Sequence, residues 1–92
     1  MTVPETPETR LKRLKIRSWR RGMKEMDLLL GGFADGALAA MVLHEIDLYE
    51  ALLAENDQDL YLWVTGAAPT PDRHLRIIAR IVSHAGVRSD CS

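Results

Sequence analysis

The nine residues "WRRGMKEMD", residues 19–27, join two stretches of helical periodicity and place a glycine between them. Before this junction, Leu11, Leu14 and Ser18 recur on one side of an otherwise basic stretch, as in a helix that buries one face. Glycine is about 1 kcal/mol less favourable than alanine inside a helix. Gly22 therefore predicts the end of the first helix, and it leaves bare backbone that another surface can approach closely.

Two matching signals predict where the first and the last helices begin. The first helix is expected at about residues 7–20, because "TPE" at residues 6–8 supplies a threonine cap, a proline at the first helical position and an acid at the positive helix end. "TPD" at residues 70–72 repeats this signal before the last helix, expected at about residues 71–85. Gly86 suits the C-terminal cap of that helix. The apolar face predicted for the last helix comprises Leu75, Ile78 and Val82, with Ile77 and Ile81 beside them.

A second helix is predicted from about Met23, because apolar residues then recur every three or four positions. The stripe comprises Met23, Met26, Leu30, Phe33, Ala37 and Met41. Gly31 and Gly32 lie inside the stripe, which continues in phase through them. This indicates either a helix weakened by glycine or a helix whose glycines let another backbone come close. Between Gly36 and Asn56, periodicity alone allows one unbroken segment.

A short helix and the lack of strand patterns complete the expected architecture. Asn56 or Asp57 caps this helix, and Gly66 ends it. Its apolar residues are Leu60, Trp63 and Val64, of which Trp63 is expected in the core. No alternation of apolar and polar residues is long enough for a sheet, so the sequence predicts an all-α bundle of four or five short helices.

Length and composition predict one globular domain in a reducing compartment. The chain has 92 residues, 47% of them hydrophobic, which suits one small core. We expect a monomeric helical-bundle domain at residues 7–86 between flexible tails at residues 1–6 and 87–92. Cys91 is the only cysteine and cannot staple the fold, which favours the cytoplasm. No apolar run is long enough to cross a bilayer, so no membrane insertion is expected.

The charges of the chain are segregated along the sequence. Residues 1–25 hold eight of the twelve Lys and Arg residues, whereas residues 26–60 hold eight acids and no Lys or Arg. This pattern favours either steered encounter with a charged partner or basic and acidic helices that pack side by side. The basic first helix, with Trp19 as a stacking face, leaves a nucleic-acid-binding regulator as an alternative function. The net charge of −1 and the acidic segment weigh against it, so no nucleic acid is expected among the partners.

Side chains that carry out catalysis or bind metals are not found at the required spacings. His44, His74 and His84 form no metal-binding pattern, and no cysteine pair accompanies them. The sequence also lacks a glycine-rich phosphate loop and the dinucleotide-binding fingerprint. We therefore expect no enzymatic activity, no metal and no tightly bound cofactor in this chain.

Two motifs resemble those of one family of small helical proteins. "RGMKE", residues 21–25, is an R-G-x-x-E motif that follows a short basic helix. "NDQDLYLWVTG", residues 56–66, is similar to the D-x-D-L-[FY]-x-W-[LVM]-x-G segment of the same family. Over roughly residues 10–85, the chain therefore resembles the succinate dehydrogenase assembly factor family, the flavinylation factors.

The resemblance implies a compact bundle of five short helices and a chaperone without catalysis of its own. It implies a break near residues 40–42, although "LAAMVLHEID" at residues 38–47 offers no Ser, Thr or Asn as a helix cap. Members of the family bind the flavoprotein subunit of succinate dehydrogenase, or in some bacteria of fumarate reductase. They promote covalent attachment of FAD to a histidine of that partner, so the FAD on which they act belongs to the partner. An antitoxin-like binding protein is a further alternative.

The resemblance implies that the partner-binding surface lies at the R-G-x-x-E motif. Arg21 is implied to present a planar donor pair to a carboxylate or phosphate, and Glu25 to pair with a cation of the partner. Gly22 is implied to let the partner come close. The predicted surface also includes the neighbouring residues Arg17, Trp19, Arg20, Lys24 and Asp27. Alternatively, Arg21 and Glu25 pair with each other, with Gly22 as a hinge. Trp19 is equally compatible with packing inside the fold.

Overall fold

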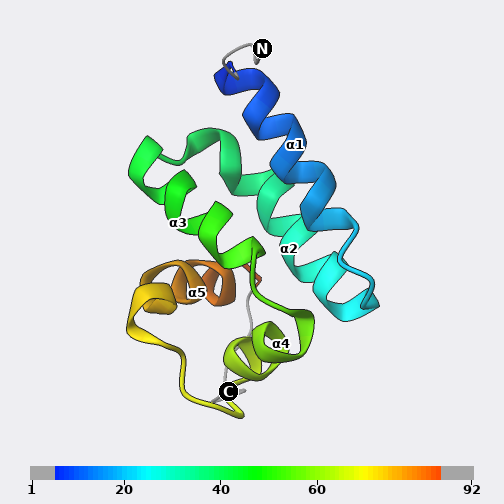
Figure 1. Ribbon diagram of the computed structural model, residues 1–92, viewed down its shortest axis with the longest axis vertical. Helices are drawn as coiled ribbons and strands as arrows, with labels where there is room; N and C mark the ends of the chain where they lie inside the picture. Colours follow the sequence, from blue (N-terminus) through cyan, green and yellow to red (C-terminus); the bar gives the residue numbers. More distant parts are fainter. Residues whose placement is uncertain (1–5, 86–92) are drawn as a thin grey trace.

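Residues 6–85 are described by a computed structural model, and within this range the chain consists of helices and contains no strand (Figure 1). The five α-helices are α1 (Pro7–Trp19), α2 (Lys24–Ala37), α3 (Leu43–Leu53), α4 (Asp57–Thr65) and α5 (Asp72–Ala85). A short 3₁₀ helix, η1 (Leu38–Ala40), follows α2 directly. The predicted all-α bundle of five short helices is thus confirmed.

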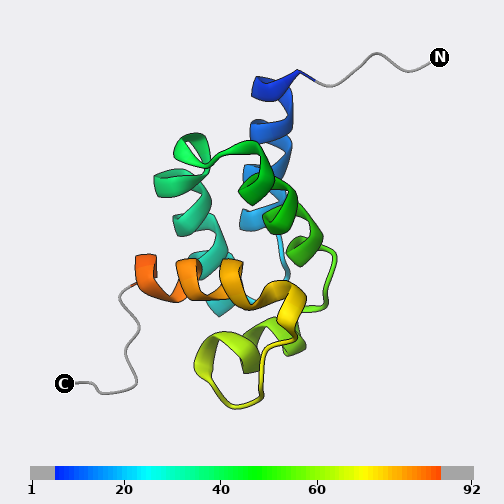
Figure 2. The same ribbon diagram turned by 90° about the vertical axis from the view of Figure 1, so that its left-hand side faces the viewer.

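The five α-helices pack so that the connection between α1 and α2 comes close to the connection between α3 and α4. α1 and α2 run antiparallel and lie side by side (Figure 1 and Figure 2). α3 packs beside them, and α5 crosses below α2 and α3 and contacts both (Figure 2). α4 lies at the lower end of Figure 1, where it contacts α2 and α5. The connection from α1 to α2 lies close to the connection from α3 to α4, because Arg21 Nη1 donates to the Leu53 carbonyl at 2.6 Å.

Apolar side chains from all five α-helices form one core. The fully or almost fully buried members include Leu14, Met26, Leu30, Phe33, Leu38, Tyr49, Leu52, Leu53, Leu60, Ile77 and Ile81. Burial of such a side chain contributes about 1.5–3 kcal/mol relative to exposure. The rings of Phe33 and Tyr49 lie at the centre, with centroids 5.3 Å apart and planes tilted by 42°. This core joins helices that are distant in sequence.

A buried hydrogen-bond network explains why a serine occupies the apolar face of α1. Ser18 Oγ lies 2.7 Å from the Leu14 carbonyl and 2.5 Å from the Tyr49 hydroxyl. That hydroxyl also lies 3.2 Å from the Leu30 carbonyl, so two hydroxyl protons serve these three contacts. Burial raises the pKa of Tyr49 to about 12, although the hydrogen bond with Ser18 acts in the opposite direction. The network satisfies the buried polar groups and ties α1, α2 and α3 together.

The helix starts predicted from local sequence are confirmed at Thr6 and Asn56. Thr6 Oγ1 accepts the backbone N–H of Thr9 at 3.1 Å, and Asn56 Oδ1 accepts that of Asp59 at 2.8 Å. These bonds satisfy N–H groups that have no partner within the helix. Gly66 ends α4 with a φ of +80°, as expected for a glycine cap.

The predicted break between the second and third helices is confirmed, and its geometry explains the missing cap. Met41 has an extended backbone, with φ −79° and ψ 144°. It therefore lies outside the helix, contrary to the predicted stripe, although its side chain is buried. Val42 takes the N-cap position of α3, and the Glu45 carboxylate accepts its N–H at 3.4 Å. An acid three residues further on thus takes the place of a Ser, Thr or Asn side chain.

The buried face of α5 differs from the predicted one. Leu75 was predicted to be buried but is 50% exposed, whereas His74 is buried. The buried residues of α5 are His74, Ile77, Ile78 and Ile81. The face is rotated because the imidazole of His74 packs 5.4 Å from the ring of Trp63 and its Nε2 meets Glu55. Trp63, predicted in the core, is only partly buried and packs at the edge of the core.

Some predictions fall on parts of the chain that the structure does not describe. The flexible tails predicted at residues 1–6 and 87–92 lie there except for Thr6, and so do Gly86 and Cys91. These tails, the bounds of the domain and the monomeric state stay predictions. Within residues 6–85, no helix combines the length and the apolar character that a membrane span requires.

Candidate functional site

The turn between α1 and α2, residues 20–23, contains the predicted junction. Gly22 has a φ of +97°, a left-handed conformation that residues with a side chain rarely adopt. The Asp27 carboxylate accepts the backbone N–H of Arg21 at 2.6 Å, which closes the turn onto the start of α2. The predicted end of the first helix before Gly22 is therefore confirmed. Asp27, predicted to contact the partner, is half-buried and shapes the turn from within.

Three hydrogen bonds from Arg21 anchor this turn to the α3–α4 linker, residues 54–56, and to the residues that flank the linker on each side. Its Nε donates to Asp57 Oδ1 at 2.7 Å, its Nη1 to the Leu53 carbonyl at 2.6 Å and its Nη2 to the Glu55 carbonyl at 2.6 Å. The side chain of Arg21 is only 11% exposed. Leu53 is the last residue of α3, so its carbonyl lacks a partner within the helix and lies at the negative end of the helix dipole. The guanidinium therefore also stabilises the end of α3.

The Arg21 guanidinium is thus occupied inside the fold. Of the two predicted arrangements, the pair between Arg21 and Glu25 does not form, and Arg21 pairs with Asp57 instead. Contact of this group with a carboxylate or phosphate of a partner stays a prediction: the three bonds use three of its five N–H donors, and its side chain is only 11% exposed. The geometry supports a different contribution, because Arg21 fixes where the turn lies.

The residues that flank Arg21 face solvent. The exposed residues of the predicted surface are Trp19, Arg20, Gly22, Lys24 and Glu25. Within residues 6–85, neither Lys24 nor Glu25 forms an ion pair. Glu25 lies in the first turn of α2, where the helix dipole favours an acid. Arg17 is half-buried and donates to the Leu53 carbonyl at 3.4 Å. The turn and the start of α2 therefore present exposed charges, and Arg17, Arg21 and Asp27 hold the turn in place from beneath.

Arg21→Lys should lower the free energy of unfolding by about 1–3 kcal/mol. A lysine ammonium cannot reproduce the planar fork that meets three acceptors, so at least one of these acceptors loses its partner. Urea denaturation followed by circular dichroism measures the change. Arg20→Lys is the matched control, because Arg20 is exposed and its replacement should change stability by less than about 0.5 kcal/mol. Equal stabilities of the two variants would contradict the anchoring role.

Trp19 ends α1 and reaches across to α2. Its indole covers Gly31, where a methyl group would overlap the ring, and its Nε1 donates to Asp35 Oδ2 at 3.2 Å. A side chain, and not the predicted backbone, thus comes close to this glycine. Trp19 is also 40% exposed, so packing inside the fold and contact with a partner are compatible. Ile16 precedes Trp19 by one helical turn in α1, and Leu28 precedes Gly31 by one helical turn in α2. Both side chains are exposed, and together with Trp19 they form an apolar margin.

The basic side of α1 is turned in part toward acids of α3. Arg10 pairs with Asp47 at 2.7 Å and with Glu50 at 2.8 Å, and Arg13 pairs with Glu50 at 2.8 Å. Burial acts to raise the pKa of Glu50, but the hydrogen bonds from Arg13 and Arg10 together lower it below its ordinary value. The predicted packing of basic against acidic helices is therefore confirmed for α1 and α3. These two arginines are less available to phosphate groups, which weakens the nucleic-acid alternative.

Contacts from α5 hold the same α3–α4 linker. Glu55 Oε2 lies 2.9 Å from His74 Nε2 and 3.1 Å from Arg73 Nη2. The hydrogen bond with His74, followed by that with Arg73, lowers the pKa of Glu55 below its ordinary value. Sequence reasoning considered His74 only as a metal ligand and missed this contact. Part of the signal was present, because His74 shares the spacing of Ile77 and Ile81 and so belongs to their helix face.

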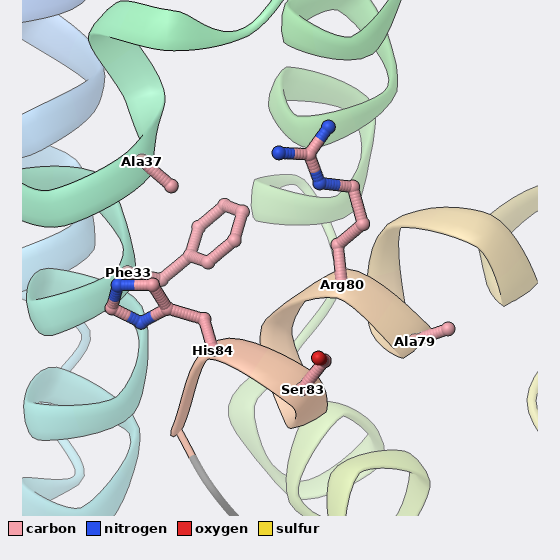
Figure 3. A pocket seen from close by; sticks show the side chains of 6 residues that line it. All are labelled: Phe33, Ala37, Ala79, Arg80, Ser83 and His84. Carbon is pink, nitrogen blue, oxygen red and sulfur yellow. The ribbon is translucent and has the colours of Figure 1, made fainter.

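A hollow of about 330 Å³ lies between α2 and α5 (Figure 3). It is lined by Phe33, Ala37, Ala79, Arg80, Ser83 and His84. The rings of Phe33 and His84 lie on one side of it, with centroids 5.5 Å apart, and Arg80 lies on the other. Arg80 Nη1 is paired with Glu45 Oε2 at 2.6 Å, so its charge is already compensated. None of the predicted site residues lines this hollow. In the described part of the chain, no cluster of three or more His, Cys, Asp or Glu residues could hold a metal.

Residues 12–85 match a protein family described as the flavinator of succinate dehydrogenase. The matching range contains the α1–α2 turn, the α3–α4 linker and all of α5. The contacts that Arg21 makes with the linker therefore lie entirely inside the matching range.

Curated proteins similar to this chain share one description. The succinate dehydrogenase assembly factor 2, mitochondrial, of Candida glabrata is 43% identical over 74 residues, which cover 77% of this chain and 48% of that protein. The protein of the same name from Meyerozyma guilliermondii is 43% identical over 72 residues, covering 75% and 53%. Succinate dehydrogenase assembly factor 2-A, mitochondrial, of Drosophila persimilis is 38% identical over 91 residues, covering 89% and 57%. The chain thus spans about half the length of the curated relatives it matches.

Proposed function

This chain belongs to the flavinator of succinate dehydrogenase family, and on that premise we propose that it is an assembly factor for the flavoprotein subunit of that enzyme. It binds the subunit and promotes covalent attachment of FAD to it, without catalysis of its own. The FAD belongs to the partner and is not held tightly by this chain. The flavoprotein subunit of a fumarate reductase is a second target of the same kind.

The observation that carries the proposal is an exposed turn whose position is fixed by hydrogen bonds from beneath. Gly22 presents backbone without a side chain, and a methyl group added there would approach only Asp57 Oδ2, at 4.0 Å. Glu25 offers an exposed carboxylate that no ion pair within residues 6–85 neutralises. Because Arg21 holds the turn through three hydrogen bonds, these groups need little ordering when a partner binds.

The partner-binding surface proposed here keeps the predicted residues and divides them by role. Arg20, Gly22, Lys24 and Glu25 meet the partner directly, with Trp19 and its apolar neighbours at the margin. Arg17, Arg21 and Asp27 act mainly from beneath, by holding the turn. A surface that combines exposed charges with an aromatic margin suits recognition of another protein. Because the direct contacts are restricted to the turn and the first residues of α2, single substitutions can test this surface.

The compartment in which the chain acts stays a prediction. The curated relatives are named mitochondrial, whereas the single cysteine of this chain favours the cytoplasm. The proposal requires only that the chain meets its flavoprotein before FAD attachment is complete.

The alternative functions receive less support from the geometry. A nucleic-acid-binding regulator would use the basic side of α1, but Arg10 and Arg13 already pair with acids of α3. An antitoxin-like binding protein has no structural feature that favours it over the assembly role. Both stay predictions that a purification from cells can separate. Nucleic acid in the purified complex, lost on nuclease treatment, would favour the first of them.

Deletion of the gene for this chain should leave the flavoprotein subunit of succinate dehydrogenase with little covalent FAD. The reason is that the chain promotes the attachment step and the subunit is still synthesised. In-gel flavin fluorescence at the mass of the subunit, normalised to an immunoblot of the same subunit, measures the effect. A plasmid copy of the unchanged chain should restore the fluorescence. Full fluorescence in the deletion strain would contradict the proposed function.

A further inference from the structure

We propose that His74 and Glu55 are positioning residues for the partner-binding turn, because they hold the α3–α4 linker on which Arg21 rests. This inference rests on the proposed function, and it adds a part of α5 to the structure that defines the binding surface. Neither residue belongs to the R-G-x-x-E motif or to the predicted partner-binding surface. Their contribution is indirect, through the place at which the turn is held.

Glu55 connects the turn to α5 through two different groups. Its backbone carbonyl accepts from Arg21 Nη2 at 2.6 Å. Its carboxylate Oε2 lies 2.9 Å from His74 Nε2 and 3.1 Å from Arg73 Nη2. The main-chain carbonyl of Glu55 thus accepts from the guanidinium of the α1–α2 turn, and its carboxylate accepts from the imidazole of α5. A displacement of Glu55 by α5 must therefore reach Arg21.

His74 is the more rigid of the two contacts from α5. Its side chain is 2% exposed, whereas that of Arg73 is 67% exposed. Exposed ion pairs are weakened by solvent screening and by the entropy of ordering long side chains. The imidazole of His74 also packs against the ring of Trp63 in α4, at a centroid distance of 5.4 Å and a tilt of 35°. The position of Glu55 is therefore set mainly by His74.

The unpaired nitrogen of His74 shows that this side chain is not an optimal packing residue. An ionised carboxylate only accepts hydrogen bonds, so Nε2 of His74 carries a hydrogen and donates to Glu55 Oε2. Nδ1 of His74 is buried and has no hydrogen-bond partner in the described part of the chain. A buried polar atom without a partner is unfavourable, and an apolar side chain of similar size would avoid it. The contact with Glu55 gives a reason for an imidazole at this place.

The geometry of Arg21 makes the turn sensitive to the linker. Its guanidinium is planar and meets acceptors on Leu53, Glu55 and Asp57 at the same time. If one acceptor moves, the guanidinium cannot follow it without losing its hydrogen bonds to the other two acceptors. Movement of the linker is therefore passed on to the turn that contains Gly22 and to the start of α2, where Glu25 lies. Small misplacements of a recognition group are enough to reduce function strongly.

His74→Phe should weaken binding of the isolated flavoprotein subunit by about tenfold or more, because phenylalanine keeps an aromatic ring but cannot donate to Glu55. His74→Gln should restore most of the affinity, since its amide N–H can take the place of Nε2. A second readout needs no partner. The Nε–H resonance of Arg21, observed by ¹⁵N NMR in the intact chain, should shift and exchange faster with water in His74→Phe and return toward its original position in His74→Gln.

Arg80→Gln is the matched control for loss of a contact made by α5. Arg80 Nη1 pairs with Glu45 Oε2 at 2.6 Å and so ties α5 to α3, but it does not touch the linker. This variant should leave the affinity within about twofold of the unchanged chain and leave the Arg21 resonance in place. If His74→Phe does not fold, Glu55→Ala tests the same contact, because it removes the carboxylate that meets His74 and leaves the backbone carbonyl that accepts from Arg21.

The outcomes separate this inference from the proposed function. If the unchanged chain does not bind the flavoprotein subunit, the proposed function fails, and the Arg21 resonance alone decides whether His74 positions the turn. If the unchanged chain binds and His74→Phe keeps both its affinity and the Arg21 resonance, the inference is overturned. The inference is also overturned if His74→Phe and Arg80→Gln lose affinity in the same proportion to their loss of thermal stability and the Arg21 resonance does not move in either variant.

Discussion

Cells whose only copy of this chain carries Gly22→Arg or Glu25→Ala should accumulate a flavoprotein subunit without covalent FAD. Glu25 is exposed in the first turn of α2, so its loss should cost the free chain only about 0.3–1 kcal/mol of helix-dipole energy. At Gly22 a long side chain would project from the surface that the partner approaches. In-gel flavin fluorescence at the mass of the subunit measures both effects, and circular dichroism should show a folded helical chain.

The chain offers a matched control for each of these variants. Glu8 is an exposed acid in the first turn of α1, so Glu8→Ala removes the same dipole interaction at a distance from the turn. Gly66 is exposed and also has a positive φ, +80° against +97° for Gly22. Gly66→Arg therefore introduces a comparable backbone strain, which costs roughly 1–2 kcal/mol. Both controls should keep full flavin fluorescence. Flavinylation that is normal in the Gly22 and Glu25 variants would show that the motif is only structural.

Phe33→Ala should lower the free energy of unfolding by about 3–5 kcal/mol, as truncation of a core aromatic residue does. Phe33 is 1% exposed and packs against Tyr49 at 5.3 Å and His84 at 5.5 Å, so its removal leaves a cavity between α2, α3 and α5. A domain of this size has a total stability of about 5–15 kcal/mol, so the variant should lie near the limit of folding. Urea or thermal denaturation monitored by circular dichroism measures the loss.

Leu28→Ala is the control for the Phe33 variant, because it truncates an apolar side chain of the same helix that is 57% exposed. Its effect should stay within about 0.5 kcal/mol. Phe33→Leu should fall between the two, since it keeps part of the buried volume. If Phe33→Ala and Leu28→Ala denature at the same urea concentration, the ring is not part of the core.

The parts of the fold that depend on local chemistry could be predicted from the sequence. Thr6 and Asn56 start helices with their own side chains, and Gly66 ends one with a left-handed backbone. The position of Gly22 between two helices followed from the cost of glycine inside a helix. Each of these signals acts within about one helical turn, so no knowledge of the tertiary structure was needed.

The failures of prediction concern contacts between distant parts of the chain. Arg21 and Glu25 are four residues apart, but that spacing brings side chains together only in a continuous helix. Because the helix is interrupted at Gly22, Arg21 instead meets residues more than thirty positions away, at Leu53 and Asp57. Two of its three acceptors are backbone carbonyls, which every residue possesses and which no motif can reveal.

The faces of α5 were misassigned for a related reason. Hydrophobicity alone favours burial of Leu75 over His74, but the tertiary structure supplies His74 with the carboxylate of Glu55 and the ring of Trp63. A polar residue with a partner can be buried at little cost. The position of the α1–α2 turn could therefore be predicted from the sequence, whereas the contacts by which α3, α4 and α5 hold it in place required the structure.

The contact between Trp19 and Gly31 restricts how these two positions can vary. The indole fills the space that any side chain at Gly31 would need. A larger residue at Gly31 is therefore compatible with the present spacing of α1 and α2 only if the residue at Trp19 becomes smaller. The combined volume of the side chains at the two positions is limited, so the residue at one position decides which residues the other can accept. Close to the turn, the separation of the two helices is set by the thickness of one aromatic ring.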